Sequence, residues 1–372
     1  MVSAPEPTHE PITMVHSLPL NDGAVVGGIE TWIGDLLDFR GLEYRVLGVS
    51  VGEEPASGSP RFDSTVASFV IANIPRQRKF LPHAIRLALG LIKNRRLLTD
   101  RIVVHRIELV PILRLLHREA RIILIIHTNL EAQLREGSDS LWRFLRIPYL
   151  VLETFALKLA DVVISHSSAD APRLKKKKPD MEVMPGWYSD RHFGLTSPPP
   201  SRGGMIWVGR FEKVKDPLLA VQAFAALPEG HGSTLSLVGS GSMRAEIEEE
   251  AETLGVRQAL ILQDPLDPAD LCQLMQQHRI LLHTSHFEGS PRVLLEALAS
   301  GLVVVTLPEC DPDRWVEKTG AGIYAESRSP EDIARAIESA PPLEPREISK
   351  YIEFRAGSRI IPHLENLFLR RP

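Results

Sequence analysis

The sequence feature that most constrains this chain is the stretch from Phe287 to Thr306, which joins a loop, a helix, a tight turn and a strand. We expect Ser290 to cap the helix, Pro291 to begin it and Gly301 to end it. The run 302–305 is apolar without alternation, which is typical of a parallel strand covered on both faces. This stretch therefore predicts part of an α/β domain built on a parallel sheet.

Two carboxylates interrupt this apolar stretch. Glu288 lies just before the helix, and Glu296 lies in its second turn. A buried carboxylate destabilises a fold unless a partner binds it, and a helix N-terminus offers backbone N–H groups and a positive dipole end that suit a phosphate. Two interpretations stay open: Glu288 is a solvated loop residue and Glu296 pairs with an arginine, or both carboxylates bind a ligand.

The block 286–305 resembles the signature of retaining, nucleotide-sugar-dependent glycosyltransferases of family 4, which have the GT-B fold. The resemblance implies that Glu296 binds the ribose hydroxyls of the donor. It also implies that Glu288 orients the donor sugar and steadies the positive charge that develops at the anomeric carbon, without acting as a covalent nucleophile. The donor diphosphate would be capped by backbone at Ser290, Pro291, Arg292 and Val293.

This sequence departs from the family pattern at two places. Residues 290–292 are Ser-Pro-Arg, where the family often has a second glycine or an aromatic residue. Residues 307–309 are Leu-Pro-Glu, where the family usually has two glycines. Both departures bear on the identity of the donor more than on the class of reaction.

The segment 205–216 is a predicted strand followed by two cations, Arg210 and Lys215. Breaking a sugar–diphosphate bond builds negative charge on the leaving group, and preorganised cations stabilise that charge. At this spacing, Arg210 and Lys215 resemble the two cations that hold the donor diphosphate in the family; a surface role for each is the alternative. In the family, backbone at the position of Leu266 contacts the base.

Asp311-Pro312-Asp313 matches the D-x-D pattern of metal-dependent glycosyltransferases. It falls in a proline-rich segment, and two cations already serve the phosphate. We therefore expect a turn here, and expect neither a metal nor a cofactor.

The first half of the chain carries its candidate residues in loops and at strand ends. Gly27 and Gly28 join a predicted strand to a helix over 29–39, a geometry that suits a phosphate, with a flexible loop as the alternative. In the family the corresponding glycines face the donor phosphates and the acceptor. His105 and His127 end two buried strands, where open α/β sheets bind ligands. His127 resembles the strand-end histidine that lies beside the donor sugar, and a structural role is the alternative.

The length of 372 residues and the repeated strand–helix order predict two Rossmann-like domains. The resemblance implies that they face a central cleft. We expect an acceptor-binding domain over 1–195, a linker over 196–204, a nucleotide-sugar-binding domain over 205–350, and a final helix over 351–372 that crosses back to the first domain.

Charge is unevenly distributed: residues 75–121 hold twelve Lys/Arg against three Asp/Glu. This segment is either a solvated face or a surface for an anionic membrane or a lipid-linked phosphate. Nucleic acid is not expected, because the sequence shows no nucleic-acid-binding module. With no signal segment and no apolar run of ~20 residues, we expect a cytoplasmic protein, peripheral at most to the inner face of the membrane.

The sequence thus predicts metal-independent transfer of a sugar, with retention, from a nucleoside diphosphate sugar such as a UDP or GDP sugar to a saccharide or lipid-linked saccharide. Alternatives are a non-catalytic two-domain nucleotide-sugar-binding protein and an epimerase or phosphorylase of similar architecture. The sugar, the base, the acceptor, the linkage and the oligomeric state stay open.

Overall fold

The computed structural model describes residues 10–19, 28–39, 41–51, 67–74, 83–127, 130, 145–195, 202–228 and 233–370. Gly27, three cations of the basic segment (Arg76, Arg78 and Lys79) and linker residues 196–201 lie outside these ranges. Contacts divide the chain into two units. The first extends to Met184 and resumes at Ile361, and the second contains Pro185–Ile360.

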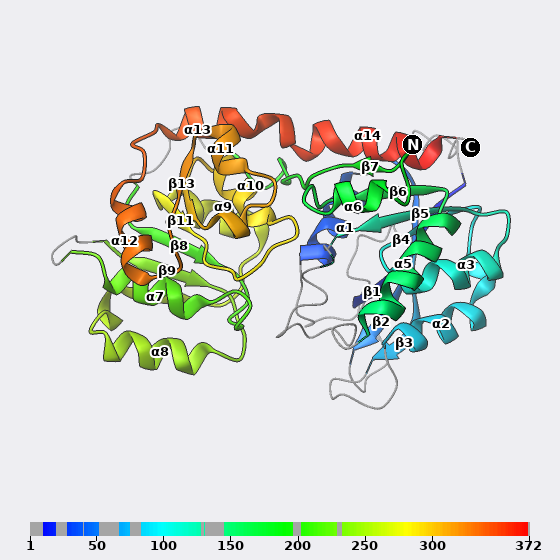
Figure 1. The fold of residues 1–372 in the computed structure, drawn as a ribbon, viewed down its shortest axis with the longest axis horizontal. Helices are drawn as coiled ribbons and strands as arrows, with labels where there is room; N and C mark the ends of the chain where they lie inside the picture. Colours follow the sequence, from blue (N-terminus) through cyan, green and yellow to red (C-terminus); the bar gives the residue numbers. More distant parts are fainter. Residues whose placement is uncertain are drawn as a thin grey trace, which may run out of the picture. The chain divides into compact units, whose positions relative to one another are not determined.

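The first unit is a parallel sheet with the strand order β3-β2-β1-β4-β5-β6-β7 (Figure 1). Neighbouring strands are in parallel register, for example Met14 with Val46 on one side and Val103 on the other. The strands are β1 Ile12–Pro19, β2 Tyr44–Val51, β3 Ala67–Ile74, β4 Arg101–Val104, β5 Arg121–Ile126, β6 Val162–Ser165 and β7 Glu182–Val183. The helices are α1 Gly28–Phe39, α2 His83–Lys93, α3 Val110–Leu116, α5 Arg146–Leu159 and α6 Ala171–Lys175.

The second unit repeats this plan with the order β10-β9-β8-β11-β12-β13, again parallel throughout. Its strands are β8 Met205–Val208, β9 Leu235–Val238, β10 Leu260–Gln263, β11 Ile280–Leu282, β12 Val303–Thr306 and β13 Gly322–Tyr324. Its helices are α7 Pro217–Ala225, α8 Arg244–Thr253, α9 Pro268–Gln276, α10 Arg292–Ala299, α11 Trp315–Thr319, α12 Pro330–Glu338 and α13 Pro345–Ile352. The expectation of two Rossmann-like domains is confirmed.

Each sheet reverses its strand order at one point, between β1 and β4 in the first unit and between β8 and β11 in the second. The connections that leave these two strands run in opposite directions across the sheet. A crevice therefore opens at their carboxyl ends, which is where sheets of this kind bind ligands. Both candidate sites described below lie at such a point.

The unbroken apolar run predicted over 302–305 is buried and forms most of β12. Gly301 ends α10 with a φ of 76°, as expected for a helix C-terminal glycine. The expectation that Ser290 caps α10 is wrong. Pro291 occupies the capping position, and the Ser290 hydroxyl accepts a hydrogen bond from the backbone N–H of Gly186 at 3.1 Å.

The bounds of the second unit are set by packing that lies outside its sheet. Residues 185–195, expected in the first domain, group with the second unit, because Tyr188 and Phe193 join its apolar core. Arg355 donates to the carbonyl oxygens of Pro185 and Gly186. The short linker expected over 196–204 therefore does not coincide with the division of contacts.

The tail of the chain returns to the first unit through α14, Gly357–Leu369. Glu365 of this helix accepts a hydrogen bond from the Tyr44 hydroxyl of β2 at 3.0 Å, and both groups are buried. The final helix expected over 351–372 is interrupted near its start by a 3₁₀ turn at Glu353–Arg355, which separates α13 from α14. Within the described ranges, no helix combines the length and the apolar composition needed to cross a membrane.

Candidate functional site

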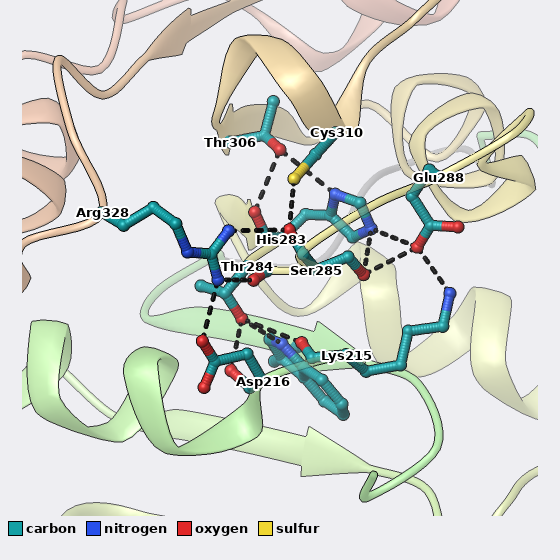
Figure 2. A network of polar contacts seen from close by, with 10 residues as sticks. Lys215, Asp216, His283, Thr284, Ser285, Glu288, Thr306, Cys310 and Arg328 are labelled. Carbon is teal, nitrogen blue, oxygen red and sulfur yellow. Dashed lines mark hydrogen bonds and ion pairs between the residues drawn. The ribbon is translucent and has the colours of Figure 1, made fainter. Parts of the chain in front are cut away.

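The second unit has its candidate site in the loop that follows β11, where Glu288 is held through a single oxygen (Figure 2). Glu288 Oε1 lies 2.5 Å from Lys215 Nζ and accepts a hydrogen bond from Ser285 Oγ at 2.6 Å. The same oxygen lies 3.2 Å from His283 Nε2. The structure thus brings together Lys215 and Glu288, two of the predicted site residues, at the switch point between β8 and β11.

The carboxylate of Glu288 is kept ionised by its neighbours. Its side chain is 12% exposed, and burial alone would raise its pKa. The charge of Lys215 and the hydrogen bond and charge of His283 outweigh burial and hold the pKa of Glu288 far below its usual range. Glu288 is therefore a fixed negative charge in this loop, and the solvated-loop interpretation is wrong.

Arg328, which the sequence analysis did not single out, fixes the backbone of this loop. Its guanidinium donates to the carbonyl oxygens of Thr284 at 2.7 Å and Ser285 at 2.9 Å. It also donates to Asp216 Oδ2 at 2.8 Å, so one side chain connects the loop after β8 to the loop after β11. In Figure 2, Arg328 lies on one side of Thr284 and Ser285, and Lys215 and Glu288 lie on the other.

Asp216 sets the direction of the residue before it, Lys215. Asp216 has a φ of 50°, and its Oδ1 accepts a hydrogen bond from the N–H of Leu219, which caps α7. Its carbonyl oxygen accepts a hydrogen bond from the Thr284 hydroxyl at 2.7 Å, and that hydroxyl in turn accepts one from the indole N–H of Trp207 at 2.9 Å. These bonds orient Lys215 toward the loop after β11.

The other side of the His283 ring is held by Thr306, at the end of β12. His283 Nδ1 lies 3.1 Å from Thr306 Oγ1, and the Thr306 hydroxyl donates to the carbonyl oxygen of His283 at 2.9 Å. Cys310 donates its S–H to the carbonyl oxygen of Ser285, and burial raises the pKa of its thiol to about 12. Cys310 is therefore a neutral group that supports the loop.

The turn after β9 supports the loop that carries Arg210. A Cβ atom at Gly239 would collide with the carbonyl oxygen of Gly209, and one at Gly241 would collide with the backbone of Phe211. Phe211 N–H donates to the carbonyl oxygen of Ser240 at 2.8 Å. These glycines allow two backbone loops to pack closely, and Arg210, at the end of β8, stays exposed to solvent.

The start of α10 places the remaining predicted residues of the second unit. Glu296 is buried, and its Oε1 lies 3.4 Å from Arg292 Nη2, one helical turn earlier. Pro291 is buried and Val293 partly so, whereas Leu266 is exposed in the loop after β10. The arginine pairing left open for Glu296 is thus present.

The Asp-Pro-Asp segment forms a turn. Asp311 is fully buried, and its Oδ2 accepts hydrogen bonds from the N–H of Val316 at 2.8 Å and from the Tyr324 hydroxyl at 2.9 Å. Asp313 is buried as well. Across the part of the chain that the structure describes, no group of three or more His, Cys, Asp or Glu residues is arranged to hold a metal ion.

The first unit places four histidines around Trp32 of α1. His16 lies in β1, and His105, His127 and His166 directly follow β4, β5 and β6. The Trp32 ring lies 5.4 Å from that of His105, 5.2 Å from that of His127 and 5.3 Å from that of His166, and the rings of His16 and His105 are 5.4 Å apart. We call these five side chains the histidine cluster.

Two of these histidines, His16 and His105, are buried and neutral. Burial, with a smaller contribution from the charge of Arg106, lowers the pKa of His16 to about 3. Burial also lowers the pKa of His105 well below its usual value, and His16 and His166 add to the effect. His105 Nδ1 lies 2.7 Å from His127 Nε2, so one ring donates and the other accepts.

The structure therefore brings His105 and His127 together, and it adds His16, His166 and Trp32. Gly28 is exposed at the start of α1, with open space where a Cβ atom would be. The strand-end rule that singled out His105 and His127 would also have found His166, His283 and Ser285, each of which follows a strand. No local signal marks Arg328.

The fold and its two switch points define the class of the protein: it has the two-domain GT-B fold. The whole chain superposes on sucrose-phosphate synthase from Thermosynechococcus elongatus with a TM-score of 0.77, at 16% identity and over 97% of this chain and 98% of that one. WaaG, described as a glycosyltransferase of lipopolysaccharide biosynthesis, gives 0.72 at 17% identity, over 97% and 100%. HepE of Anabaena, solved with UDP and glucose, gives 0.71 at 18% identity, over 97% and 100%.

The sequence comparisons match the second unit to glycosyltransferases as well. Residues 198–351 match the family model described as glycosyl transferases group 1. The lipopolysaccharide glucosyltransferase WaaG of Escherichia coli K12 is 32% identical over 124 residues, which cover 32% of each chain. The matched segment is thus about a third of that relative. The family match contains Arg210, Lys215, Glu288 and Glu296.

Proposed function

We propose that this protein is a glycosyltransferase that moves a sugar from a nucleoside diphosphate sugar to a saccharide or lipid-linked saccharide. The observation that carries the proposal is the Lys215–Glu288 pair, fixed at the switch point of the sheet whose sequence matches glycosyl transferases group 1. The names of WaaG and the presence of UDP and glucose in HepE support the donor and acceptor classes.

Lys215 and Arg210 would stabilise the diphosphate as it leaves. The Lys215 ammonium has three N–H donors, and its contact with Glu288 uses one of them. The Arg210 guanidinium is exposed and free to meet a ligand oxygen. A unit charge at ~4 Å contributes roughly 4 kcal/mol at an effective dielectric of 20, which is about three powers of ten in rate if it acts mainly on the transition state.

Glu288 would orient the donor sugar. Its Oε1 is occupied by Lys215, Ser285 and His283, whereas no hydrogen bond of Oε2 is recorded among the described residues. Oε2 can therefore accept from a sugar hydroxyl. The permanent negative charge would also steady positive charge at the anomeric carbon, which fits retention of configuration without a covalent glycosyl-enzyme.

The remaining residues would complete the donor site. The N-terminal backbone of α10, at Ser290 to Val293, would cap the diphosphate. Glu296 would bind the ribose hydroxyls while Arg292 holds its Oε1. The backbone at Leu266 would contact the base. His127 of the first unit would contact the sugar as a hydrogen-bond partner.

The charge on the leaving group would be met by cationic side chains, so we propose that transfer needs neither metal nor cofactor. Asp311 is fully buried, and its Oδ2 accepts from Val316 N–H and the Tyr324 hydroxyl, which supports a structural role for this residue. A cytoplasmic location, where we expect the donor to be available, is part of the same proposal.

The test is a panel of labelled UDP and GDP sugars, incubated with and without EDTA. We expect transfer or slow hydrolysis of one donor, unchanged by EDTA and lost in Arg210→Ala, with Lys213→Ala as the control because Lys213 is exposed in the same loop. The anomeric configuration of the product, read by NMR, tests retention. Binding of a nucleotide with no turnover of any donor would identify a binding protein, and a rearranged donor or a need for phosphate would identify an epimerase or a phosphorylase.

A further inference from the structure

Three neighbouring helices of the first unit cover one face of its sheet. α3 contacts both α2 and α5, so the three form one layer (Figure 1). Their inner side chains, among them Leu87 of α2, Leu113 of α3 and Leu157 of α5, join the apolar core of this unit. The layer thus has a well-defined inner face and an opposite, outer face.

The outer face of this layer is also apolar. Ile147, Val151 and Phe155 follow one another at intervals of four residues along α5, and the first two are 75% and 65% exposed. Leu115 of α3 is 72% exposed, and the exposed large apolar side chains of α2 are Ile85, Leu89 and Ile92. A row of aliphatic side chains across three adjoining helices indicates a surface that something covers.

Cations border this apolar surface. Residues 83–121 contain nine Lys/Arg and three Asp/Glu. Lys93, Arg95 and Arg96 follow the last exposed aliphatic residue of α2, and with Phe69 they line a surface hollow of about 590 Å³. Within the described residues these three cations form no ion pair with a carboxylate, whereas Arg106 and Arg114 do.

We propose that the outer face of α2, α3 and α5, with Lys93, Arg95 and Arg96 at its border, docks on an anionic lipid bilayer. Exposed aliphatic and aromatic side chains suit the acyl boundary, and a basic border suits lipid phosphates. The hollow between Phe69 and the three cations takes one phosphate head group. The sequence analysis assigned membrane binding to the basic segment 75–121 alone. The structure adds the exposed apolar side chains of α5, between residues 147 and 155.

The charge of the border selects a bilayer over a second copy of the chain. Two copies meeting through this face would bring the cations of each border close together, because a two-fold contact places the same patch on both partners. Like charges would then oppose association, whereas an anionic bilayer is complementary to the apolar centre and to the basic border.

The test is flotation of the full chain, without donor or acceptor, with vesicles of phosphatidylcholine alone or mixed with phosphatidylglycerol. We expect binding to the mixed vesicles that weakens with salt. Ile147→Ser/Val151→Ser/Phe155→Ser should weaken it about tenfold or more, since each side chain contributes buried apolar area. Lys93→Ala/Arg95→Ala/Arg96→Ala should cost roughly fivefold for each cation removed.

Matched controls distinguish binding through this surface from non-specific binding through other exposed apolar side chains. Leu254→Ser/Ile261→Ser removes two exposed aliphatic side chains of the second unit and should leave vesicle binding unchanged. Circular dichroism should show that all variants stay folded. The proposal is overturned if the wild type binds neither kind of vesicle, if both triple variants bind as the wild type does, or if the wild type forms a dimer that the α5 variant dissociates. None of these readouts depends on sugar transfer.

Discussion

The two sheets place polar side chains at the same topological position and give them opposite character. Beside the β1/β4 switch point stand neutral histidines packed around an indole. Beside the β8/β11 switch point stand Lys215, Glu288, Asp216 and Arg328, linked in ion pairs. Neutral imidazoles suit a ligand that presents hydroxyls, and an ionic site suits a ligand that carries a diphosphate.

The difference teaches that burial alone does not determine the charge of a site. Burial opposes the charged form in both places, because it lowers the pKa of histidines and raises that of carboxylic acids. Around His16 and His105 the neighbours add to burial, so these groups are neutral. Around Glu288 the charge of Lys215 reverses the effect of burial, so the group is ionised. The following predictions test this contrast, from the largest expected effect to the smallest.

Removing the cation beside Glu288 should have the largest effect. Lys215→Ala should lower kcat/KM for sugar transfer roughly 10²- to 10³-fold, because a positioned donor to the leaving group is lost. Steady-state assays with the donor found in the panel above measure the effect. Lys213→Ala, two residues away and exposed, should stay within about twofold of the wild type. Equal losses in both variants would show that only the charge of the loop matters.

Removing Arg328, the partly buried side chain that connects the two loops, should have the next largest effect. Arg328→Ala should lower the free energy of unfolding by about 3 kcal/mol, since two carbonyl oxygens and Asp216 lose a charged donor. Arg335, which is 62% exposed and pairs with Asp332 on α12, offers a control: Arg335→Ala should change it by less than about 0.5 kcal/mol. Urea denaturation measures both, and similar midpoints would contradict a supporting role for Arg328.

As the pH falls, the free energy of unfolding should first decrease because of the neutral histidines, and only at lower pH because of Glu288. The pKa of His16 falls from 6.5 to about 3 on folding, so between these values the unfolded chain binds a proton that the folded chain does not. The free energy of unfolding should therefore decrease as the pH falls below 6.5, by roughly 1.4 kcal/mol per pH unit for this one group. The pKa of Glu288 is lowered from 4.5, so its contribution is present above 4.5 and is lost only below that value.

Two substitutions separate these windows in denaturation curves recorded from pH 7 to pH 4. His16→Gln should reduce the slope of the curve between pH 6.5 and 4.5, where His105 still contributes, whereas Glu288→Gln should leave that part unchanged. His363→Gln alters an exposed histidine of α14 and should leave the whole curve unchanged. A wild-type curve that is flat down to pH 4.5 would contradict a neutral, buried His16.

The smallest expected effect concerns a single hydroxyl. Ser285→Ala removes the hydrogen bond to Glu288 Oε1 and should lower the free energy of unfolding by about 1 kcal/mol. Ser242→Ala removes a similar bond to Glu212 in an exposed place, at 2.9 Å, and should cost under about 0.5 kcal/mol. Differential scanning calorimetry resolves the two. A larger loss for Ser242→Ala would show that burial does not strengthen the bond at Glu288.

The sequence predicted most strands of both sheets, because each is a short apolar run that ends in a turn. It made no prediction for β3 and the short β13, each of which lies at an edge of its sheet. It predicted Lys215 and Glu288 from their spacing and their resemblance to a family motif. It missed His283, Ser285 and Arg328, and it misplaced Ser290, whose hydroxyl serves Gly186, 104 residues earlier.

By itself, the sequence determined two α/β domains with parallel sheets, and it identified Glu288, the carboxylate just before α10. Both follow from hydrophobic periodicity and local motifs, which act within about twenty residues. Only the tertiary structure decided which side chains form hydrogen bonds with one another and which form ion pairs. His16, His105, His127 and His166 come from four separate strands or strand ends, and Arg328 comes from beyond β13. Their pKa values and partners depend on distances of a few ångströms that the chain fixes only when both sheets are folded.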